Sequence, residues 1–312
     1  MSAKKILVVY YSQSGQMHDI ADQFCTSFSA DSSYVVSYEQ LKPVTGFPFP
    51  WSAFSFFNAF PETFKEKPIA LQPFSNNIMG DYDLVILAYQ PWFLTPSPVI
   101  SSFLQTEEGK QLLTGKKVVT LIGCRNMWLG AQEKVKKRLA AVGAKIIANI
   151  ALVDKSPNVV SVVTILRWLL WGKKEKWWIL PAAGVSEADV AMCATYGAMT
   201  KAALEMDKLN DLQQSLNEKG AVEIVPELVL MEKRGQRSFS IWSGFVGGKP
   251  IGSAARNARV YLFMFLLPTA VFILSPLLMI VSALMLRLKR DELMADVEYY
   301  KGNGPLTPPR GL

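Results

Sequence analysis

Residues 6–16 read ILVVYYSQSGQ, a run of apolar residues followed at once by a turn that contains serine and glycine. A continuous apolar run of this length is typical of a strand that is buried on both faces of a sheet. A helical pattern follows, with apolar side chains at Ile20, Ala21, Phe24 and Phe28. The N-terminus therefore predicts a strand, a short loop and a helix in succession.

Four further apolar runs of strand length follow along the chain, at 34–38, 84–89, 117–122 and 145–153. Amphipathic patterns predict helices at 99–110, 129–142 and 187–216, the last with Ser186 as its N-cap. Buried strands that alternate with such helices indicate a parallel sheet covered on both faces. We therefore expect an α/β fold with a flavodoxin-like, doubly wound sheet of five parallel strands.

Segments outside this minimal fold divide the rest of the chain. The predicted domain covers 1–220, with insertions at 43–75 and 155–185, and is followed by a connecting region (221–258), a hydrophobic membrane segment (259–290) and a C-terminal tail (291–312). The first insertion holds many aromatic residues, among them Trp51 and Phe54. Because so much apolar surface marks a binding region, we expect this insertion to be a lid that meets Trp92.

Composition excludes several classes of site. The chain has 312 residues, a net charge of +7, three scattered cysteines and one histidine, His18. Without paired cysteines or clustered histidines, a disulfide framework and a zinc site are not expected, a histidine-based metal cluster is excluded, and a reducing compartment is expected. The basic balance suits anionic partners, but no nucleic-acid-binding module is present.

The turn after the first strand has the chemistry of a phosphate site. Hydroxyls at Ser12 and Ser14 can donate to phosphate oxygens, Gly15 permits close approach, and the helix N-terminus offers free N–H groups. Flavodoxins bind the phosphate of FMN in such a loop, although Met17 here replaces the last hydroxyl. The loop is neither GxGxxG nor a P-loop; the alternative is an ordinary helix-capping turn. The predicted FMN contacts are Ser12, Gln13, Ser14, Gly15, Gln16 and Met17.

Two further loops follow the strands at 84–89 and 117–122, at the same predicted edge of the sheet. Aromatic residues there can pack on the flavin ring, and Gly123 lets the backbone approach it. The alternative is that Trp92 and Trp128 are core aromatics. The predicted ring contacts are Gln90, Pro91, Trp92, Phe93, Gly123, Cys124, Arg125, Asn126 and Trp128.

Several long strings resemble the flavodoxin-like proteins of dialkylresorcinol biosynthesis, often labelled dialkylresorcinol condensing enzymes. They are PFPWSAFSFFNAFPETF (48–64), YQPWFLTPSP (89–98), IGCRNMWLGAQEKVKKRL (122–139), NIALVD (149–154) and VSVVTILRW (160–168). The resemblance implies a flavoenzyme that aromatises a lipid-like 2,5-dialkylcyclohexane-1,3-dione, made by a ketosynthase partner, to a resorcinol. A condensing activity does not fit, because thiolase-type condensation uses a Cys with His partners and this chain has only His18.

Aromatisation needs a group that stabilises an enolate and a group that accepts a proton. Arg125 is the candidate for the first role, and His18, Tyr89 and Asp154 are candidates for the second, whereas Cys124 is expected to be a buried small residue. Two other functions stay open. One is an FMN-dependent NAD(P)H or quinone oxidoreductase, and the other is a non-catalytic electron carrier or scaffold for the ketosynthase.

Residues 260–286 form a run without charged residues, and this run is long enough to cross a bilayer. Pro268 and Pro276 interrupt the run, so a single span and a re-entrant insertion both stay open. The Trp- and Lys-rich stretch 168–178 is typical of a segment at the membrane interface. We expect a membrane-associated protein with its flavin domain on the cytoplasmic side.

Overall fold

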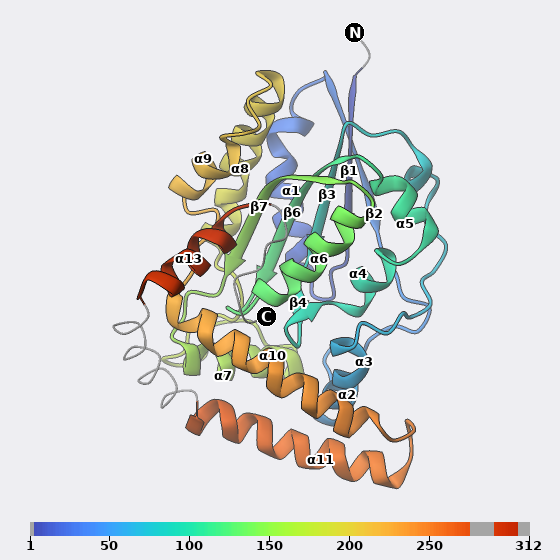
Figure 1. Cartoon of the computed structure of the whole chain (residues 1–312), viewed down its shortest axis with the longest axis vertical. Coiled ribbons are helices and arrows are strands. Elements are labelled where there is room, and N and C mark those ends of the chain that lie inside the picture. Colours follow the sequence, from blue (N-terminus) through green and yellow to red (C-terminus); the bar gives the residue numbers. More distant parts are fainter. Residues whose placement is uncertain (1–2, 275–289, 305–312) are drawn as a thin grey trace.

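The computed structural model describes residues 3–274 and 290–304 and is built around five parallel strands (Figure 1). These are β1 (Lys4–Tyr10), β2 (Tyr34–Gln40), β3 (Leu84–Tyr89), β6 (Lys117–Cys124) and β7 (Lys145–Val153). Their order is β2-β1-β3-β6-β7, with every neighbouring pair parallel. This is the flavodoxin-like order, so the predicted fold class is confirmed.

Helices cover both faces of the sheet and enclose two apolar cores. One face packs against α1 (Gln16–Ser29), α8 (Glu187–Glu205) and α9 (Leu212–Glu218). The other packs against α4 (Pro98–Phe103), α5 (Glu107–Leu113) and α6 (Leu129–Ala141). The strands β1, β3, β6 and β7 are apolar over most of their length because both of their faces are buried, whereas the edge strand β2 is only partly buried.

Two predicted helices are each divided in the structure. The helix expected at 99–110 ends at Phe103, because the Thr106 side chain accepts a hydrogen bond from Gly109 N–H and starts α5. The helix expected at 187–216 begins as predicted, with Ser186 as its N-cap. It ends at Glu205, and a positive φ of 53° at Asp207 reverses the chain before α9.

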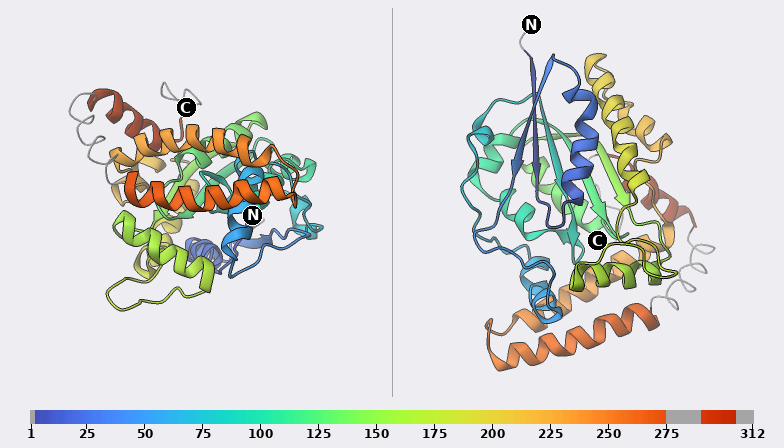
Figure 2. Two further views of the ribbon diagram at one scale, coloured as in Figure 1. Left: turned by 90° about the horizontal axis from the view of Figure 1, so that it is seen from below. Right: turned by 180° about the vertical axis from the view of Figure 1, so that it is seen from behind.

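The two insertions form helices at the carboxyl ends of the strands. The first contains α2 (Ala53–Asn58) and α3 (Phe60–Phe64), and the second contains α7 (Asn158–Trp171); the turn η1 (Asn76–Met79) follows the first insertion and precedes β3. Between β3 and α4, the short strands β4 (Pro91–Trp92) and β5 (Thr95–Pro96) pair in an antiparallel hairpin. In Figures 1 and 2, α2, α3 and α7 lie together at this end of the sheet.

The C-terminal region is more ordered than the sequence predicts. The expected connecting region contains α10 (Pro226–Gly247), and α11 (Ala254–Thr269) runs beside it into the π-helical turn η2 (Ala270–Leu274). The expected tail contains α13 (Arg290–Lys301), which packs on the α6 face. The expectations for residues 275–289 and 305–312 lie outside the described residues.

A buried carboxyl group links α10 to α6. Glu232 is 2% exposed and accepts a hydrogen bond from Gly130 N–H at 2.7 Å, in the first turn of α6. Burial raises the pKa of Glu232 from 4.5 to about 7, although the backbone N–H groups of α6 oppose this change. The carboxyl group thus binds a proton more tightly in the folded state than in the unfolded state. Its contribution to stability is full below pH 4.5 and is lost as the pH rises to about 7.

We expect Glu232→Gln to remove this pH dependence, because the amide stays neutral and still accepts from Gly130 N–H. Between pH 4.5 and 8, the free energy of unfolding of the native chain should fall by about 3 kcal/mol relative to the variant. Guanidinium unfolding at both pH values measures the difference. Parallel pH profiles for the two proteins would contradict the expectation.

Candidate functional site

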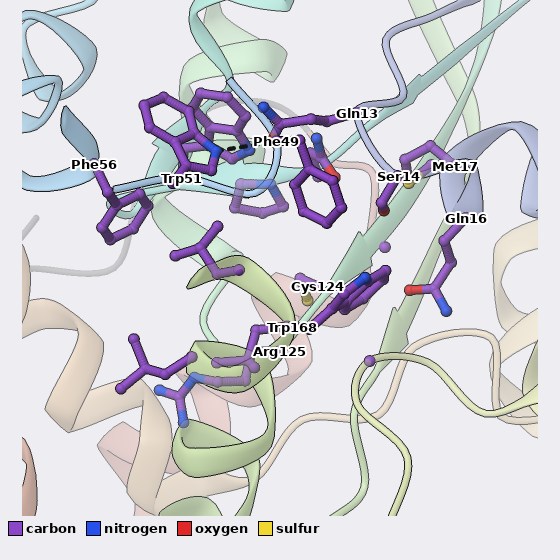
Figure 3. Close-up of a pocket in the computed structure, with 18 of the residues that line it drawn as sticks. Gln13, Ser14, Gln16, Met17, Phe49, Trp51, Phe56, Cys124, Arg125 and Trp168 are labelled. Carbon is purple, nitrogen blue, oxygen red and sulfur yellow. Dashed lines mark hydrogen bonds between the residues drawn. The ribbon is translucent and has the colours of Figure 1, made fainter. Parts of the chain in front are cut away.

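A cavity of about 280 Å³ lies where the loops after β1, β3 and β6 meet (Figure 3). This is the carboxyl edge of the sheet beside the switch point between β1 and β3, where open α/β sheets bind their ligands. The predicted contacts that line it are Gln13, Ser14, Gln16, Met17, Gln90, Pro91, Trp92, Phe93, Gly123, Cys124 and Arg125. Three loops that are distant in the sequence, and that were predicted to lie at one edge of the sheet, therefore line one cavity.

The loop after β1 is suited to hold a phosphate group. The Ser12 hydroxyl oxygen is buried and has no hydrogen-bond partner among the described residues. Gly15 is the N-cap of α1 with φ of 92° and no side-chain cap, so the first N–H groups of α1 are not bound by a capping side chain. An unpaired buried hydroxyl is costly, and a phosphate oxygen would accept from it and from the helix N-terminus. The residues present thus fit the phosphate of FMN.

Met17 departs from the flavodoxin pattern in a way that the structure explains. Its side chain is 2% exposed, and its Sδ lies 2.7 Å from the position that a Cβ on residue 123 would take. Any larger residue at Gly123 would therefore collide with Met17. The thioether fills space between α1 and β6, where a hydroxyl would leave a gap.

The first insertion contacts the loop after β1 and meets Trp92, as predicted for the lid. Trp51 Nε1 donates to Gln13 Oε1 at 3.1 Å, and Gln13 Nε2 donates to the Pro48 carbonyl at 3.1 Å. The rings of Phe47 and Trp51 lie 5.1 Å and 5.6 Å from that of Trp92, between centroids. The predicted contact between the lid and Trp92 is confirmed, whereas Phe54 does not line the cavity.

The second insertion supplies a wall that sequence reasoning missed. Ile165, Leu166, Trp168 and Leu169 of α7 line the cavity, and Trp51 N–H donates to the Leu169 carbonyl at 2.8 Å. In Figure 3, Trp168 lies near Cys124 and Gln16.

The expectation that Trp168 lies at a membrane interface is wrong, since its ring is 9% exposed and turned inward. Spacings of three and four among the apolar residues of 165–169 are the signal that could have found this wall.

Gln16 forms two hydrogen bonds to Val185, in the chain that follows α7. Its Nε2 donates to the Val185 carbonyl at 2.9 Å, and its Oε1 accepts from Val185 N–H at 3.3 Å. A Cβ at Gly184 would lie 2.8 Å from the Trp168 ring and 2.9 Å from Gln16 Oε1, so only glycine fits there. The cavity is thus enclosed by α1, both insertions and the loops after β3 and β6.

Arg125 supplies the cationic group of the cavity. One guanidinium nitrogen donates to Asn158 Oδ1 at 2.6 Å, and within the described ranges the group forms no ion pair with a carboxylate. Burial lowers the pKa of Arg125, because the guanidinium loses hydration. A charged group with only a neutral partner is able to bind an anionic oxygen of a ligand. Burial also raises the pKa of Cys124, which keeps this neighbour a neutral thiol.

Other predicted residues lie outside the cavity. Trp128 packs in the α6-side core, and Asn126 donates to Asn158 Oδ1 at 2.9 Å; neither lines the cavity. Tyr89 is fully buried, and its hydroxyl donates to Gln132 at 2.6 Å, so it is not placed to accept a proton from a ligand. His18 lies on the exposed side of α1. The Asp154 carboxylate accepts from Ser161 at 2.6 Å instead of facing the cavity.

The fold and this edge define a flavodoxin-like α/β protein with two helical insertions over its ligand site. No family model and no curated protein matches the chain by sequence. Solved structures that share part of the fold include a protein from Bacteroides eggerthii DSM 20697 assigned as a flavoprotein (22% identity, TM-score 0.35, 44% of this chain and 82% of that chain).

A flavoprotein from Lactobacillus acidophilus NCFM, solved with FMN, shares 18% identity over 42% of this chain and 85% of that chain (TM-score 0.34). The Trp repressor binding protein of Bacillus subtilis shares 12% identity over 54% and 98% of the two chains (TM-score 0.29). Because all three TM-scores are low, none of these likenesses assigns a function to this chain.

Proposed function

We propose that this protein is an FMN-dependent oxidoreductase that aromatises a 2,5-dialkylcyclohexane-1,3-dione to a dialkylresorcinol at a membrane surface. The observation that carries the proposal is the convergence of both insertions on the cavity at the phosphate loop. A flavodoxin-like domain needs neither insertion for its fold. The apolar walls that they add are therefore available to a second, lipid-like ligand.

The residues that would hold FMN come from the minimal fold. Ser12, Ser14 and the first N–H groups of α1 would bind its phosphate, and the backbone at Gly123 together with Trp92 would border its ring. When bound, FMN supplies a two-electron acceptor. The lid and α7 would exclude water from the same space once ligands are bound, which strengthens electrostatic interactions inside it.

The charge in the cavity suits a cyclic dione. Such a ring is acidic and loses one proton to form an enolate, and loss of a hydride equivalent from that enolate leaves the resorcinol after enolisation. Overall, two electrons and two protons leave the ring. Among the described residues that line the cavity, none is Asp, Glu or His, whereas Arg125 is present and forms no ion pair with a carboxylate of the described part of the chain. Arg125 would bind the enolate oxygen and hold the ring in place.

The test begins with the full chain purified in detergent. Mass analysis of the released cofactor should find FMN, and anaerobic mixing with a long-chain 2,5-dialkylcyclohexane-1,3-dione should bleach the flavin and yield one resorcinol per flavin. FAD, or no flavin, would contradict the cofactor assignment. If the flavin stays oxidised with every dione but bleaches with NAD(P)H and reduces quinones, the quinone oxidoreductase takes the place of the aromatase.

The lid should set the preference for chain length. Trp51 and Phe56 line the cavity, and we expect their joint replacement by Ala to weaken the dependence of kcat/KM on alkyl length while FMN stays bound. Burial of one methylene contributes about 0.8 kcal/mol, or roughly fourfold in kcat/KM. A series of diones of increasing chain length measures this slope.

Phe54→Ala is the matched control, because Phe54 belongs to the same insertion but packs against Tyr261, with 5.2 Å between ring centroids. Its slope should equal that of the native chain. Equal slopes for all three proteins would place the alkyl chains elsewhere.

A further inference from the structure

The apolar C-terminal segment is attached to the flavodoxin-like domain on both sides. Before it, α10 packs along the domain, and its Lys233 pairs with Asp296 of α13 at 2.7 Å. After it, α13 buries Val297 and Tyr300 in the same core as α6. A segment that crosses a bilayer once leaves its two flanks on opposite sides. Here both flanks belong to one folded body, so a single crossing between α10 and α13 does not fit.

One face of α11 is fixed to the domain. Val260 and Phe263 are buried, and the Phe263 ring stacks on Phe60 with centroids 4.4 Å apart. The buried Arg256 pairs with Glu62 of α3 at 2.6 Å. A lone spanning helix exposes its whole circumference to lipid, which would break this ion pair and leave a buried charge unpaired. The inner face of α11 is therefore unavailable to a bilayer.

The opposite face of α11 is apolar and exposed. Tyr261, Leu262 and Phe265 are exposed, as is Ile273 of the following turn η2, and Phe265 is 70% exposed. The stretch Ala254–Ile273 has a mean hydropathy of 1.2 and is only 17% buried, so by length and composition alone it resembles a membrane span. An exposed apolar surface of this kind marks an interaction site.

A second exposed apolar patch follows α7. It consists of Trp171, Trp177, Trp178 and Ile179, with Lys173, Lys174, Lys176 and one carboxylate, Glu175, between them in the chain; Glu175 pairs with Arg167 at 2.7 Å. Trp178 is 83% exposed. Tryptophan and lysine together are typical of the headgroup region of a bilayer, where the ring is half in lipid and the ammonium group meets phosphate.

We propose that the outer face of α11 and this tryptophan patch dock the protein on one leaflet of a membrane that contains anionic lipid, with α11 in the plane of the leaflet. Figure 2 shows α10 and α11 side by side at the end of the molecule where the strands end, with α7 next to them. The protein then approaches the bilayer from one side and does not span it through α11.

The surface fits a lipid leaflet better than a second copy of the chain. Two copies that met through the same patch would bring Lys173, Lys174 and Lys176 close to their own counterparts, and like charges repel. An anionic leaflet would attract the exposed Lys173 and Lys176, whereas the Lys174 ammonium lies over the Trp168 ring at 5.4 Å. The net charge of +7 points the same way.

Docking also bears on the cavity, in a step that rests on the proposed function. Ile165, Leu166 and Leu169 of α7 line the cavity, while Trp171 at the end of the same helix is exposed. One helix thus joins the cavity wall to the docking surface. A dialkylated ring dissolved in the leaflet would reach the cavity along α7 without crossing water.

The binding test uses the full-length chain and sedimentation with vesicles. Vesicles of phosphatidylcholine mixed with phosphatidylglycerol should bind the protein much more strongly than phosphatidylcholine alone, by roughly fivefold for each lysine at the surface. Phe265→Glu should lower binding at least about tenfold, since it places a charge on the apolar face. Met206→Glu is the control, because Met206 is 63% exposed and follows α8, away from α11. Equal loss in both variants, or a stable dimer that Phe265→Glu dissociates, would overturn the proposal.

The topology test asks on which side the two flanks lie. Ile251→Cys precedes α11 and is 69% exposed, and Met294→Cys lies on α13 and is 40% exposed. In sealed vesicles, a membrane-impermeant maleimide should label both from the same side, with the native chain as the background for its own cysteines. Labelling from opposite sides would show a span. Neither test needs flavin or turnover, so docking and the proposed reaction can fail separately.

Discussion

Replacing Gly15 by Asp is expected to abolish FMN binding. Gly15 ends the loop at the N-terminus of α1, and a Cβ there would meet no atom within 4 Å, so a side chain has room. The carboxylate would lie beside the phosphate. Two unit charges 4 Å apart repel by about 4 kcal/mol at an effective dielectric constant of 20, which is roughly a thousandfold in Kd. Titration of the apoprotein with FMN, followed by flavin fluorescence, measures the loss.

Two matched variants separate charge from backbone strain. Gly15→Asn has nearly the same shape, tolerates the φ of 92° about as well and carries no charge, so it should keep most of the affinity. Gly143→Asp adds a carboxylate at another open glycine, with φ of 67°, after α6. It should bind FMN as the native chain does. If the Asp and Asn variants at position 15 lose affinity equally, backbone strain and not charge is the cause, whereas full retention of affinity in Gly15→Asp would place the phosphate elsewhere.

The sheet and the position of the loop between β1 and α1 could be predicted because their signals are local. Each strand is a continuous apolar run, and the predicted bounds differ from the observed ones by at most a few residues. The loop at Ser12–Gly15 follows from the chemistry that a helix N-terminus offers to an anion. Parallel strands then bring the loops after 84–89 and 117–122 to the same edge. None of these steps needs knowledge of tertiary packing.

The sequence did not predict which side of a helix or loop faces the cavity. The apolar residues of α7 suit an interface helix and a cavity wall equally well, and only its docking through the Leu169 carbonyl and Trp51 decides between them. Trp128 and Trp92 both follow strand ends, yet Trp128 turns into the core while Trp92 faces the cavity. The direction of an aromatic side chain in a loop after a strand is decided by the packing of the neighbouring helices, which the local sequence does not show.

The topology of the C-terminal region could not be predicted from the sequence either. An uncharged run of 260–286 predicts contact with lipid by composition, but the topology of that contact depends on α13, which returns to the domain beyond it. The Lys233–Asp296 pair and the buried Tyr300 are long-range contacts without a local signal. The choice between a span and an insertion therefore depends on contacts that the composition of the run does not show.

Arg125→Gln is expected to lower turnover of the dione by about a hundredfold to a thousandfold, the usual cost of removing a group that stabilises developing charge. FMN should stay bound, because the phosphate loop is untouched. Single-turnover bleaching at saturating dione measures the rate, and flavin titration measures binding. Arg138→Gln is the control. Arg138 lies on α6, pairs with Glu66 at 3.0 Å and does not line the cavity. Loss of this guanidinium should leave the rate within about threefold.

A structural role for Arg125 predicts a different result. Its guanidinium donates to Asn158 Oδ1 at 2.6 Å, and this bond holds the first turn of α7 against the loop after β6. If that is all Arg125 does, Asn158→Ala removes the same hydrogen bond and should slow bleaching as much as Arg125→Gln. If the guanidinium binds the enolate, Asn158→Ala frees it and leaves most of the rate, and Arg125→Lys, which keeps the charge but not the planar fork, should fall between the two. The order of the three rates therefore decides whether the cation acts on the ligand or only on the fold.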